Sequence, residues 1–275
     1  MKNKSNIITV IESHLSDMTD VEQLIAHYFI EQALTSDDLS SQYIANVLHI
    51  SQAALTRFAK KCGFNGYREF VFEFLSHQEK IRATFPTIQH DLTKRVFLDY
   101  DAITRQSHEL IDEEQLQRVA QMIEGAERVY FFGKGSSGLV AKELKLRLMR
   151  LGVICEAFTE RDSFAWSLSI LDEKCLVMGF SLSGQSASVI DSLFAAQEKG
   201  AKVVLFTTAS KEFQGKFSDT IALASVRHLD YGTRISPQFP MLFVLDILYA
   251  YFLEIDRPRK EAIFNAYIDK MKQKV

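Results

Sequence analysis

Five short apolar runs after residue 125 constrain the fold of this chain more than any other feature. They cover residues 128–132, 153–158, 175–180, 202–206 and 220–224, and segments with helical periodicity separate them. Consecutive apolar residues of this kind are typical of parallel strands that helices cover on both faces. We therefore predict a doubly wound α/β domain with a mostly parallel five-stranded sheet.

The first part of the chain has no strand pattern. Apolar residues recur at spacings of three and four through residues 5–77, which is the periodicity of helices. From residue 78 to 110 this periodicity weakens and Pro86 interrupts it. A chain of 275 residues is long enough for two domains. We predict an all-α domain over residues 1–77, a helical linker over 78–110 and the α/β domain over 111–275.

Composition and cysteine spacing exclude several classes of protein. Hydrophobic residues make up 47% and charged residues 24%, as in globular proteins. The most apolar segment, residues 241–253, contains Asp246 and is shorter than the ~20 residues that span a bilayer. Cys62, Cys155 and Cys175 lie far apart without metal-ligand spacing. We expect a cytoplasmic protein without a signal peptide, membrane partner, metal site or cofactor.

A helix-turn-helix pattern lies within the all-α part. Ser40 precedes a short helix with apolar residues at positions 44, 47 and 48, and small Ala45 allows close approach of a second helix. After a three-residue turn, Ser51 caps a second predicted helix over residues 52–61. Gly63 is positioned to end that helix.

The second helix has a face suited to DNA. Leu55, Phe58 and Ala59 are predicted to pack in the core, which leaves polar and small side chains outward. Glutamine and arginine pair with adenine and guanine, small side chains contact the thymine methyl group, and lysine contacts phosphate. An ordinary helical hairpin with a solvated basic face has the same spacing, so both interpretations stay open on spacing alone. The candidate DNA contacts are Ser41, Gln52, Ala53, Thr56, Arg57, Lys60 and Lys61.

The residues of this segment resemble the DNA-binding domain of the RpiR/MurR family. The resemblance covers about residues 40–75, and its most specific part is the run from Gly63 through Phe64, Gly66 and Tyr67 to Phe70. It implies a helix-turn-helix that binds DNA. Ala54 departs from the family, which usually carries threonine there, so a hydroxyl that could contact a phosphate or base is missing.

A glycine-rich loop follows the first predicted strand. Residues 133–138 have the spacing GxGxxG, and Glu156 ends the next strand. This is the fingerprint of a dinucleotide site. A tight turn that requires glycine only for its backbone conformation has the same sequence pattern.

A second loop argues against a dinucleotide. Residues 181–186, Ser-Leu-Ser-Gly-Gln-Ser, follow the third strand and lead directly into a helix. Free amides and the positive end of the helix dipole, joined by hydroxyls, suit a small anion such as phosphate. Serines that merely cap the helix are the structural alternative.

The two loops together resemble the SIS (sugar isomerase) domain. That domain carries Gly-x-Gly-x-Ser after its first strand and Ser-x-Ser-Gly-x-Ser/Thr after its third. The resemblance assigns the matching serines to a sugar-phosphate site, while residues 207–211 depart from the family and leave their contacts open. With their neighbours, the expected site residues are Gly135, Ser136, Ser137, Ser181, Ser183, Gly184, Gln185 and Ser186.

The order of the two motifs resembles that of an RpiR-type transcription regulator. This implies double-stranded operator DNA and a sugar-phosphate effector as partners. A homodimer or tetramer is expected, because two-fold related recognition helices bind a palindrome.

Two other functions stay open. In the first, the chain is a SIS-type sugar-phosphate isomerase, which needs a general base; Glu160, Asp162 and His228 are candidates, but none stands in a recognisable catalytic arrangement. In the second, the N-terminal helices bind another protein. We predict a regulator with no catalytic residues and no enzyme activity.

Overall fold

The computed structural model describes residues 7–31, 38–225 and 235–272, and it divides the chain into two compact units. The first unit ends at Leu98 and the second begins at Asp99. Each unit has its own hydrophobic core, and each is described by itself below.

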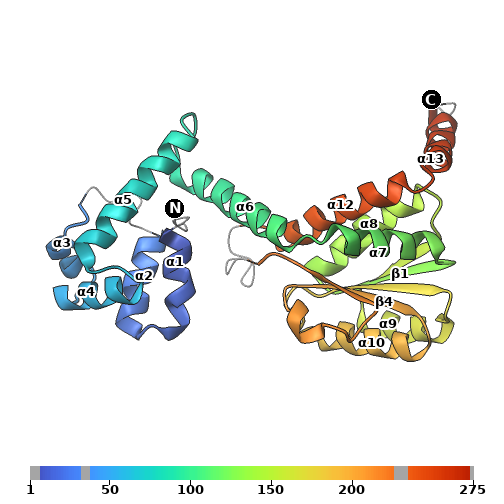
Figure 1. Ribbon diagram of the computed structural model, residues 1–275, viewed down its shortest axis with the longest axis horizontal. Helices are drawn as coiled ribbons and strands as arrows, with labels where there is room; N and C mark the ends of the chain where they lie inside the picture. The colour runs from blue at the N-terminus through green and yellow to red at the C-terminus, as the bar shows by residue number, and fades with distance from the viewer. Residues whose placement is uncertain (1–6, 32–37, 226–234, 273–275) are drawn as a thin grey trace. The chain divides into compact units, whose positions relative to one another are not determined.

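The described part of the N-terminal unit is helical, as predicted. Its helices are α1 (Ile7–His14), α2 (Asp20–Glu31), α3 (Ser41–Val47), α4 (Gln52–Lys61) and α5 (Tyr67–Thr84) (Figure 1). Helix α6 (Asp91–Leu110) begins in this unit and ends in the next. Helix α5 continues well past residue 77, and the segment around Pro86 separates α5 from α6.

Aromatic side chains form the centre of the N-terminal core. The Phe29 ring on α2 packs edge-on against Phe70 and Phe74 on α5, with ring centroids 4.8 and 5.1 Å apart, and it stacks on Phe58 of α4. These four side chains are fully buried. Burial of an aromatic side chain removes a large apolar area from water, so these contacts hold α4 against α2 and α5.

The second unit is built on a parallel sheet, which confirms the predicted α/β class. Its strands are β1 (Arg128–Gly133), β2 (Cys155–Phe158), β3 (Cys175–Phe180), β4 (Lys202–Thr207) and β5 (Asp219–Ala222). Their order across the sheet is β2-β1-β3-β4-β5, and every neighbouring pair is parallel. The predicted runs match these strands to within two residues at each end.

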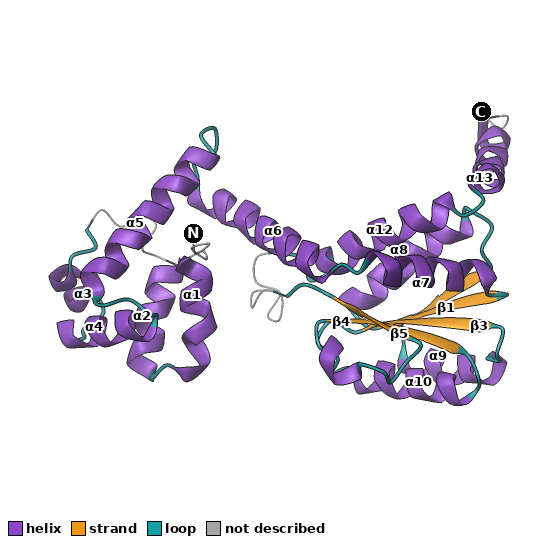
Figure 2. Cartoon of the chain, viewed as in Figure 1, coloured by secondary structure: helices purple, strands orange, loops and turns teal. Residues whose placement is uncertain are grey.

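Helices cover both faces of the sheet (Figure 2). Helices α7 (Glu113–Gly125), α8 (Ser136–Met149) and α12 (Phe239–Glu254) pack on one face, and α9 (Arg161–Ser167) and α10 (Ala187–Glu198) pack on the other. Helix α13 (Arg257–Lys272) follows α12. No described helix is both long enough and apolar enough to cross a membrane.

Ser236 precedes α12 but does not cap it. Ser236 Oγ accepts from Gln238 N in a turn, and the helix begins at Phe239 with Pro240 in its first turn. The proline needs no hydrogen-bond acceptor there, because the first amides of a helix have no intrahelical partner. Apolar side chains bury one side of α12 in the core, so this helix has a structural role within the domain.

The strand order places the two candidate loops next to each other. Strand β1 pairs with β2 on one side and with β3 on the other, and Gly133 at the end of β1 is in register with Phe180 at the end of β3. The chain reverses its direction of winding at this pair. Ligands of doubly wound sheets bind at such a point, outside the carboxyl ends of the strands.

Candidate functional site

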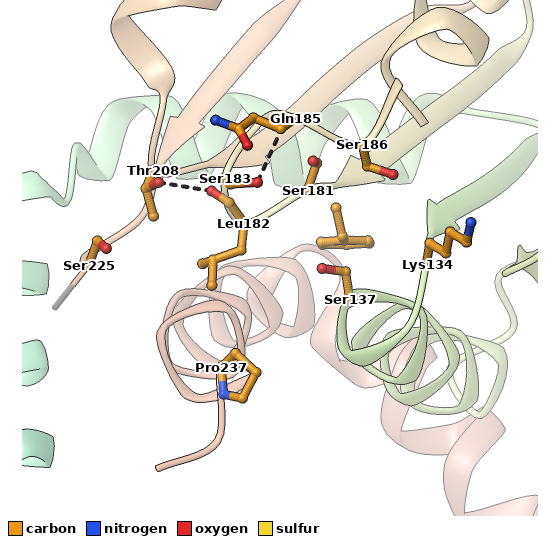
Figure 3. A pocket seen from close by; sticks show the side chains of 11 residues that line it. Lys134, Ser137, Ser181, Leu182, Ser183, Gln185, Ser186, Thr208, Ser225 and Pro237 are labelled. Carbon is orange, nitrogen blue, oxygen red and sulfur yellow. Dashed lines mark hydrogen bonds between the residues drawn. The ribbon is translucent and has the colours of Figure 1, made fainter. Parts of the chain in front are cut away.

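A cavity of about 640 Å³ lies at the carboxyl ends of β1 and β3 (Figure 3). The structure brings five of the eight predicted site residues to its wall: Ser137, Ser181, Ser183, Gln185 and Ser186. Gly135, Ser136 and Gly184 belong to the same loops but do not line it. Ser137 projects from the first turn of α8, and the other four lie on the loop between β3 and α10.

Ser181 is the most informative residue of this wall. Its side chain is 3% exposed, and its Oγ has no hydrogen-bond partner among the described residues. Its backbone is fixed, because its N–H donates to Phe206 O at 3.1 Å and its carbonyl accepts from Gly184 N at 3.1 Å. A buried hydroxyl without a partner is costly. The wall of the cavity therefore contains a buried hydroxyl whose donor and acceptor are not used by the described residues.

The loop around Ser181 is closed by local hydrogen bonds. Ser183 is exposed, and its Oγ accepts from Gln185 N at 3.3 Å. Ser186 is the N-cap residue of α10, but its side chain makes no capping bond. The Ser181 hydroxyl thus has no described hydrogen-bond partner and the Ser186 hydroxyl makes no capping bond, whereas the Ser183 hydroxyl stabilises the turn.

Two helices begin beside the cavity. Helix α8 begins at Ser136 after Gly135, and α10 begins at Ala187 after Ser186. The first amides of each helix lack intrahelical acceptors and carry the positive end of the helix dipole. Among the described lining residues Lys134 is a cation and none is a carboxylate. This chemistry favours an anion such as a phosphate group.

Residues of neighbouring segments complete the wall, although they were not among the predicted site residues. Thr208 follows β4, Ser225 follows β5, and Lys134 follows β1. The Thr208 hydroxyl donates to Leu182 O at 2.9 Å and so ties the β4 loop to the β3 loop. Thr208 directly follows a predicted strand, as the site serines do, and that position was the signal available in the sequence.

The glycines of the two loops are explained by packing. A Cβ on Gly133 would lie 2.7 Å from Ser137 O, and one on Gly138 would lie 2.8 Å from Gly133 O. Gly184 has a φ of +72°, and a Cβ there would lie 2.9 Å from the Phe213 ring. The positive φ and the contact with Phe213 therefore both favour glycine at position 184. The close approach of β1 and α8 therefore accounts for Gly133 and Gly138, and the φ of +56° at Gly135 favours glycine there.

The residues considered for other chemistry do not form a second site. Glu156 forms an ion pair with Lys145 on α8. Glu160 and Asp162 lie at the start of α9 and do not line the cavity, and His228 lies outside the described residues. Within the described ranges no group of three metal-binding side chains is found.

The three thiols are not activated. Burial raises the pKa of Cys62 to about 12 and that of Cys155 to about 11. Burial, followed by its hydrogen bond with Asp172, also raises the pKa of Cys175. A thiol with a raised pKa is a poor nucleophile.

The helix-turn-helix has the predicted geometry. Helix α4 spans Gln52–Lys61, and Ser51 Oγ caps it by accepting from Ala54 N at 3.2 Å. Ser40 caps α3 in the same way. In the turn, His49 has a φ of +52° and Ile50 N donates to Ala45 O at 2.9 Å.

Most of the candidate DNA contacts lie on one exposed side of this motif. Gln52, Ala53, Thr56, Arg57 and Lys60 are exposed on α4. The Ser41 hydroxyl on α3 donates to Gln52 Oε1 at 3.2 Å, which restrains the glutamine and leaves its NH₂ group free to donate. Within the described part of the chain, Arg57 and Lys60 form no ion pair.

Two residues of α4 differ from expectation. Lys61 Nζ lies 2.9 Å from Glu22 Oε2, so the two side chains form an ion pair within the N-terminal unit. A backbone hydrogen bond from Thr19 and the contact with Lys61 keep the pKa of Glu22 below its usual value, although burial opposes the shift. Ala54 is 3% exposed, so a side chain at this position packs inside the unit. Alanine in place of the family's threonine therefore removes no outward-facing hydroxyl.

The family-specific run that begins at Gly63, after α4, has a structural role. Gly63 has a φ of +85° and ends α4, and the Phe64 ring packs edge-on against Phe70. The Tyr67 hydroxyl donates to Leu39 O at 3.0 Å, and burial raises its pKa above the usual range. This run therefore fixes α5 against the segment that precedes α3.

Comparisons with protein families match both parts of the chain. A model described as a helix-turn-helix domain of the rpiR family matches residues 5–78, and a SIS domain model matches residues 122–234. A protein of Haemophilus influenzae named an uncharacterized HTH-type transcriptional regulator is 27% identical over 269 residues, which cover 92% of each chain.

Two solved structures share the fold. The Vibrio vulnificus NanR protein complexed with ManNAc-6P has a TM-score of 0.61 and 20% identity, and the match covers 98% of this chain and 99% of that one. The sugar isomerase domain of an RpiR transcription factor from Sphaerobacter thermophilus has a TM-score of 0.58 and 22% identity, over 66% of this chain and 99% of that one.

Proposed function

The chain belongs to the RpiR type of helix-turn-helix regulators that carry a SIS domain, and we propose that a sugar phosphate in its β1–β3 cavity controls its binding to operator DNA. The main support for binding of a sugar phosphate is the Ser181 hydroxyl, which is buried and has no described hydrogen-bond partner. It lies at a cavity whose described lining has no carboxylate.

DNA binding is assigned to the exposed side of α4. Arg57 and Gln52 have the donors that pair with guanine and adenine in the major groove, and Ala53 and Thr56 are small enough to lie against a thymine methyl group. Lys60 and Ser41 are proposed to contact phosphates. Lys61 is left out of this set because its ammonium group pairs with Glu22.

The effector is proposed to place its phosphate against the 181–186 loop. Ser181, Ser183 and Ser186 supply hydroxyls, and the first turns of α8 and α10 supply amides. The solved NanR protein contains ManNAc-6P, which is a ligand of this chemical class. Hydroxyls and amides bind a phosphate by several short hydrogen bonds and allow it to leave again.

A homo-oligomer is part of the proposal, because a single recognition helix covers only a few base pairs. Leu139, Leu146 and Met149 on α8 are 55%, 52% and 49% exposed and lie on one side of that helix. We propose that this apolar side contributes to the interface. Sedimentation velocity of the parent and of Leu146→Glu tests this, and an unchanged parental mass in the variant would contradict it.

Transcription control is proposed without turnover of the sugar. The described lining residues include no carboxylate or imidazole that could act as a general base, and the relative from H. influenzae is named as a regulator. A SIS-type isomerase is the alternative. Steady interconversion of aldose and ketose phosphates by the purified protein would support it.

The proposal is tested in two steps with the full chain. A thermal-shift screen of hexose, pentose and amino-sugar phosphates, including ManNAc-6P, identifies the ligand, and gel shifts with the DNA upstream of the gene identify the operator. We expect one class of sugar phosphate to raise Tm and to change operator affinity. A protein that binds no upstream DNA, or whose DNA binding is unaffected by every ligand that raises Tm, would contradict the proposal.

A further inference from the structure

Helix α6 contacts the wall of the cavity through a hydrogen bond between distant parts of the sequence. Gln106 Oε1 accepts from the backbone N–H of Ser225 at 3.0 Å, across 119 positions. Ser225 lines the cavity and is drawn at its edge in Figure 3. A side chain of α6 therefore holds the main chain of a residue that faces the ligand site.

A second contact joins the same helix to another segment of the wall. The Tyr100 ring packs edge-on against Phe239, with ring centroids 4.5 Å apart. Phe239 begins α12 two residues after Pro237, which also lines the cavity. Between these contacts Ile103 is fully buried, so one side of α6 is fixed over its second half.

Helix α6 is continuous from Asp91 to Leu110, although the chain divides into its two units between Leu98 and Asp99. Between its ends, a continuous α-helix carries an unbroken ladder of i→i−4 backbone hydrogen bonds, so it moves largely as a stiff element. A shift of its second half is therefore transmitted to its first half, which belongs to the unit that contains the helix-turn-helix.

We propose that Gln106 couples occupancy of the cavity to α6 and, through this helix, to DNA binding. The inference rests on the proposed function and adds the route of regulation. A ligand that contacts Ser225 alters the position or the mobility of its backbone, and the bond to Gln106 passes this change to the helix. Gln106 is a positioning residue, because it acts through Ser225. Coupling of this kind requires that the ligand favour one of two states of the protein.

The test compares Gln106→Leu with Gln106→Glu. Leucine has a similar volume but cannot accept a hydrogen bond, whereas the glutamate carboxylate retains an acceptor oxygen for Ser225 N–H. The matched control is Gln121→Leu, which makes the same change at an exposed position on α7. The probes are ManNAc-6P, glucose 6-phosphate, ribose 5-phosphate and inorganic phosphate, each used at saturation if it binds.

The measured quantity is the ratio of operator affinities with and without the probe. We expect the ratio for Gln106→Leu to differ from the parental ratio by at least threefold, in the direction of one. The ratios for Gln106→Glu and Gln121→Leu should stay within twofold of the parental ratio. Because the probe is saturating, a weaker affinity for it does not by itself lower the ratio. A parental ratio in Gln106→Leu would overturn the inference.

Hydrogen exchange of the parent protein gives a second measurement that needs no variant. We expect the probe to slow exchange of amides in the second half of α6, and unchanged exchange there would also overturn the inference. A parent protein that responds to no probe would instead overturn the proposed function. A parent that responds while Gln106→Leu responds equally would overturn only the role of Gln106.

Discussion

The ammonium group of Lys61 lies 2.9 Å from Oε2 of Glu22, which joins the end of α4 to the first turn of α2. The Glu22 side chain is 11% exposed, so its charge is poorly hydrated. The same carboxylate accepts from Thr19 N at 3.0 Å. This ion pair fixes α4 within its unit, and it neutralises a charge that could otherwise contribute to the side of α4 proposed to bind DNA.

Lys61→Met should therefore lower stability and leave DNA binding nearly intact. The substitution keeps much of the apolar chain but leaves Glu22 without its cation. We expect a loss of about 1 to 2 kcal/mol in the free energy of unfolding, measured by urea denaturation. The salt dependence of operator binding should remain parental. A weaker salt dependence with normal stability would mean that Lys61 contacts phosphate.

Arg57→Ala should weaken binding to the operator by about 1 to 3 kcal/mol, because arginine pairs with guanine through two hydrogen bonds. Binding to unrelated DNA should change less, so specificity at one position of each half-site should relax. Titrations of an operator series with single base changes measure both effects. Equal affinity of variant and parent for every member would exclude a base contact.

Lys60→Ala should weaken binding to all sequences alike. Lys60 is exposed on α4 and has the flexible single charge suited to a phosphate. Removal of one phosphate contact should reduce the slope of log K against log salt concentration by about one unit. Lys61→Met is the control, since it removes an adjacent charge that is already paired. An unchanged slope in Lys60→Ala would exclude the contact.

Features of the helix-turn-helix that depend on residues close together in the sequence could be predicted, whereas features that depend on distant residues could not. The bounds of α4 follow from Ser51 and Gly63, which act on backbone groups a few residues away. The partner of Lys61 is 39 positions distant, and no local pattern indicates it. The burial of Ala54 likewise depends on how the first turn of α4 meets the rest of the core.

The cavity shows the same limit. Ser181 and Ser186 were identified because they share one loop with a recognisable pattern. Thr208 and Ser225 enter from the loops after β4 and β5, and their place in the wall depends on the strand order. The sequence predicts a parallel sheet but not which strands are neighbours, so the full lining could not be named.

Ser181→Ala should lower the affinity for the effector by about ten- to a hundredfold, which is the range for one hydrogen bond to a charged group. The stability of the ligand-free protein should be unchanged or slightly higher, because the variant removes a buried hydroxyl without a partner. Operator binding without effector should survive. Calorimetry and thermal unfolding measure these effects.

Comparison with Ser183→Ala separates binding from loop structure. Ser183→Ala also removes the bond to Gln185 N, so it should affect both ligand affinity and the loop. The variant with both serines replaced should lose two or more decades of affinity. Parental affinity in Ser181→Ala would place the phosphate elsewhere.

His77→Gln should reduce the pH dependence of stability. Burial of His77 on α5, and then the charge of Lys80, lower its pKa below the usual 6.5, and its Nε2 has no described hydrogen-bond partner. The unfolded chain therefore binds a proton at a higher pH than the folded chain does. Stability should fall as the pH drops below 6.5 and should level off once the pH is below the folded-state pKa.

Urea titrations of the full chain between pH 7.5 and 5 measure this effect. We expect a smaller pH slope in His77→Gln than in the parent. His90→Gln, which removes an exposed imidazole, is the control and should keep the parental slope. Equal slopes in the parent and His77→Gln would show that protonation of His77 does not oppose folding.

The described lining of the cavity holds hydroxyls, an amide, apolar groups and the ammonium group of Lys134, but no carboxylate and no imidazole. Hydroxyls and amides keep the same charge throughout the pH range of a living cell. The group that titrates in that range is the phosphate of the ligand, whose second ionisation lies near pH 6. We therefore expect any change in effector affinity between pH 5 and 7 to follow the ionisation of the ligand's own phosphate rather than that of a described residue of the wall.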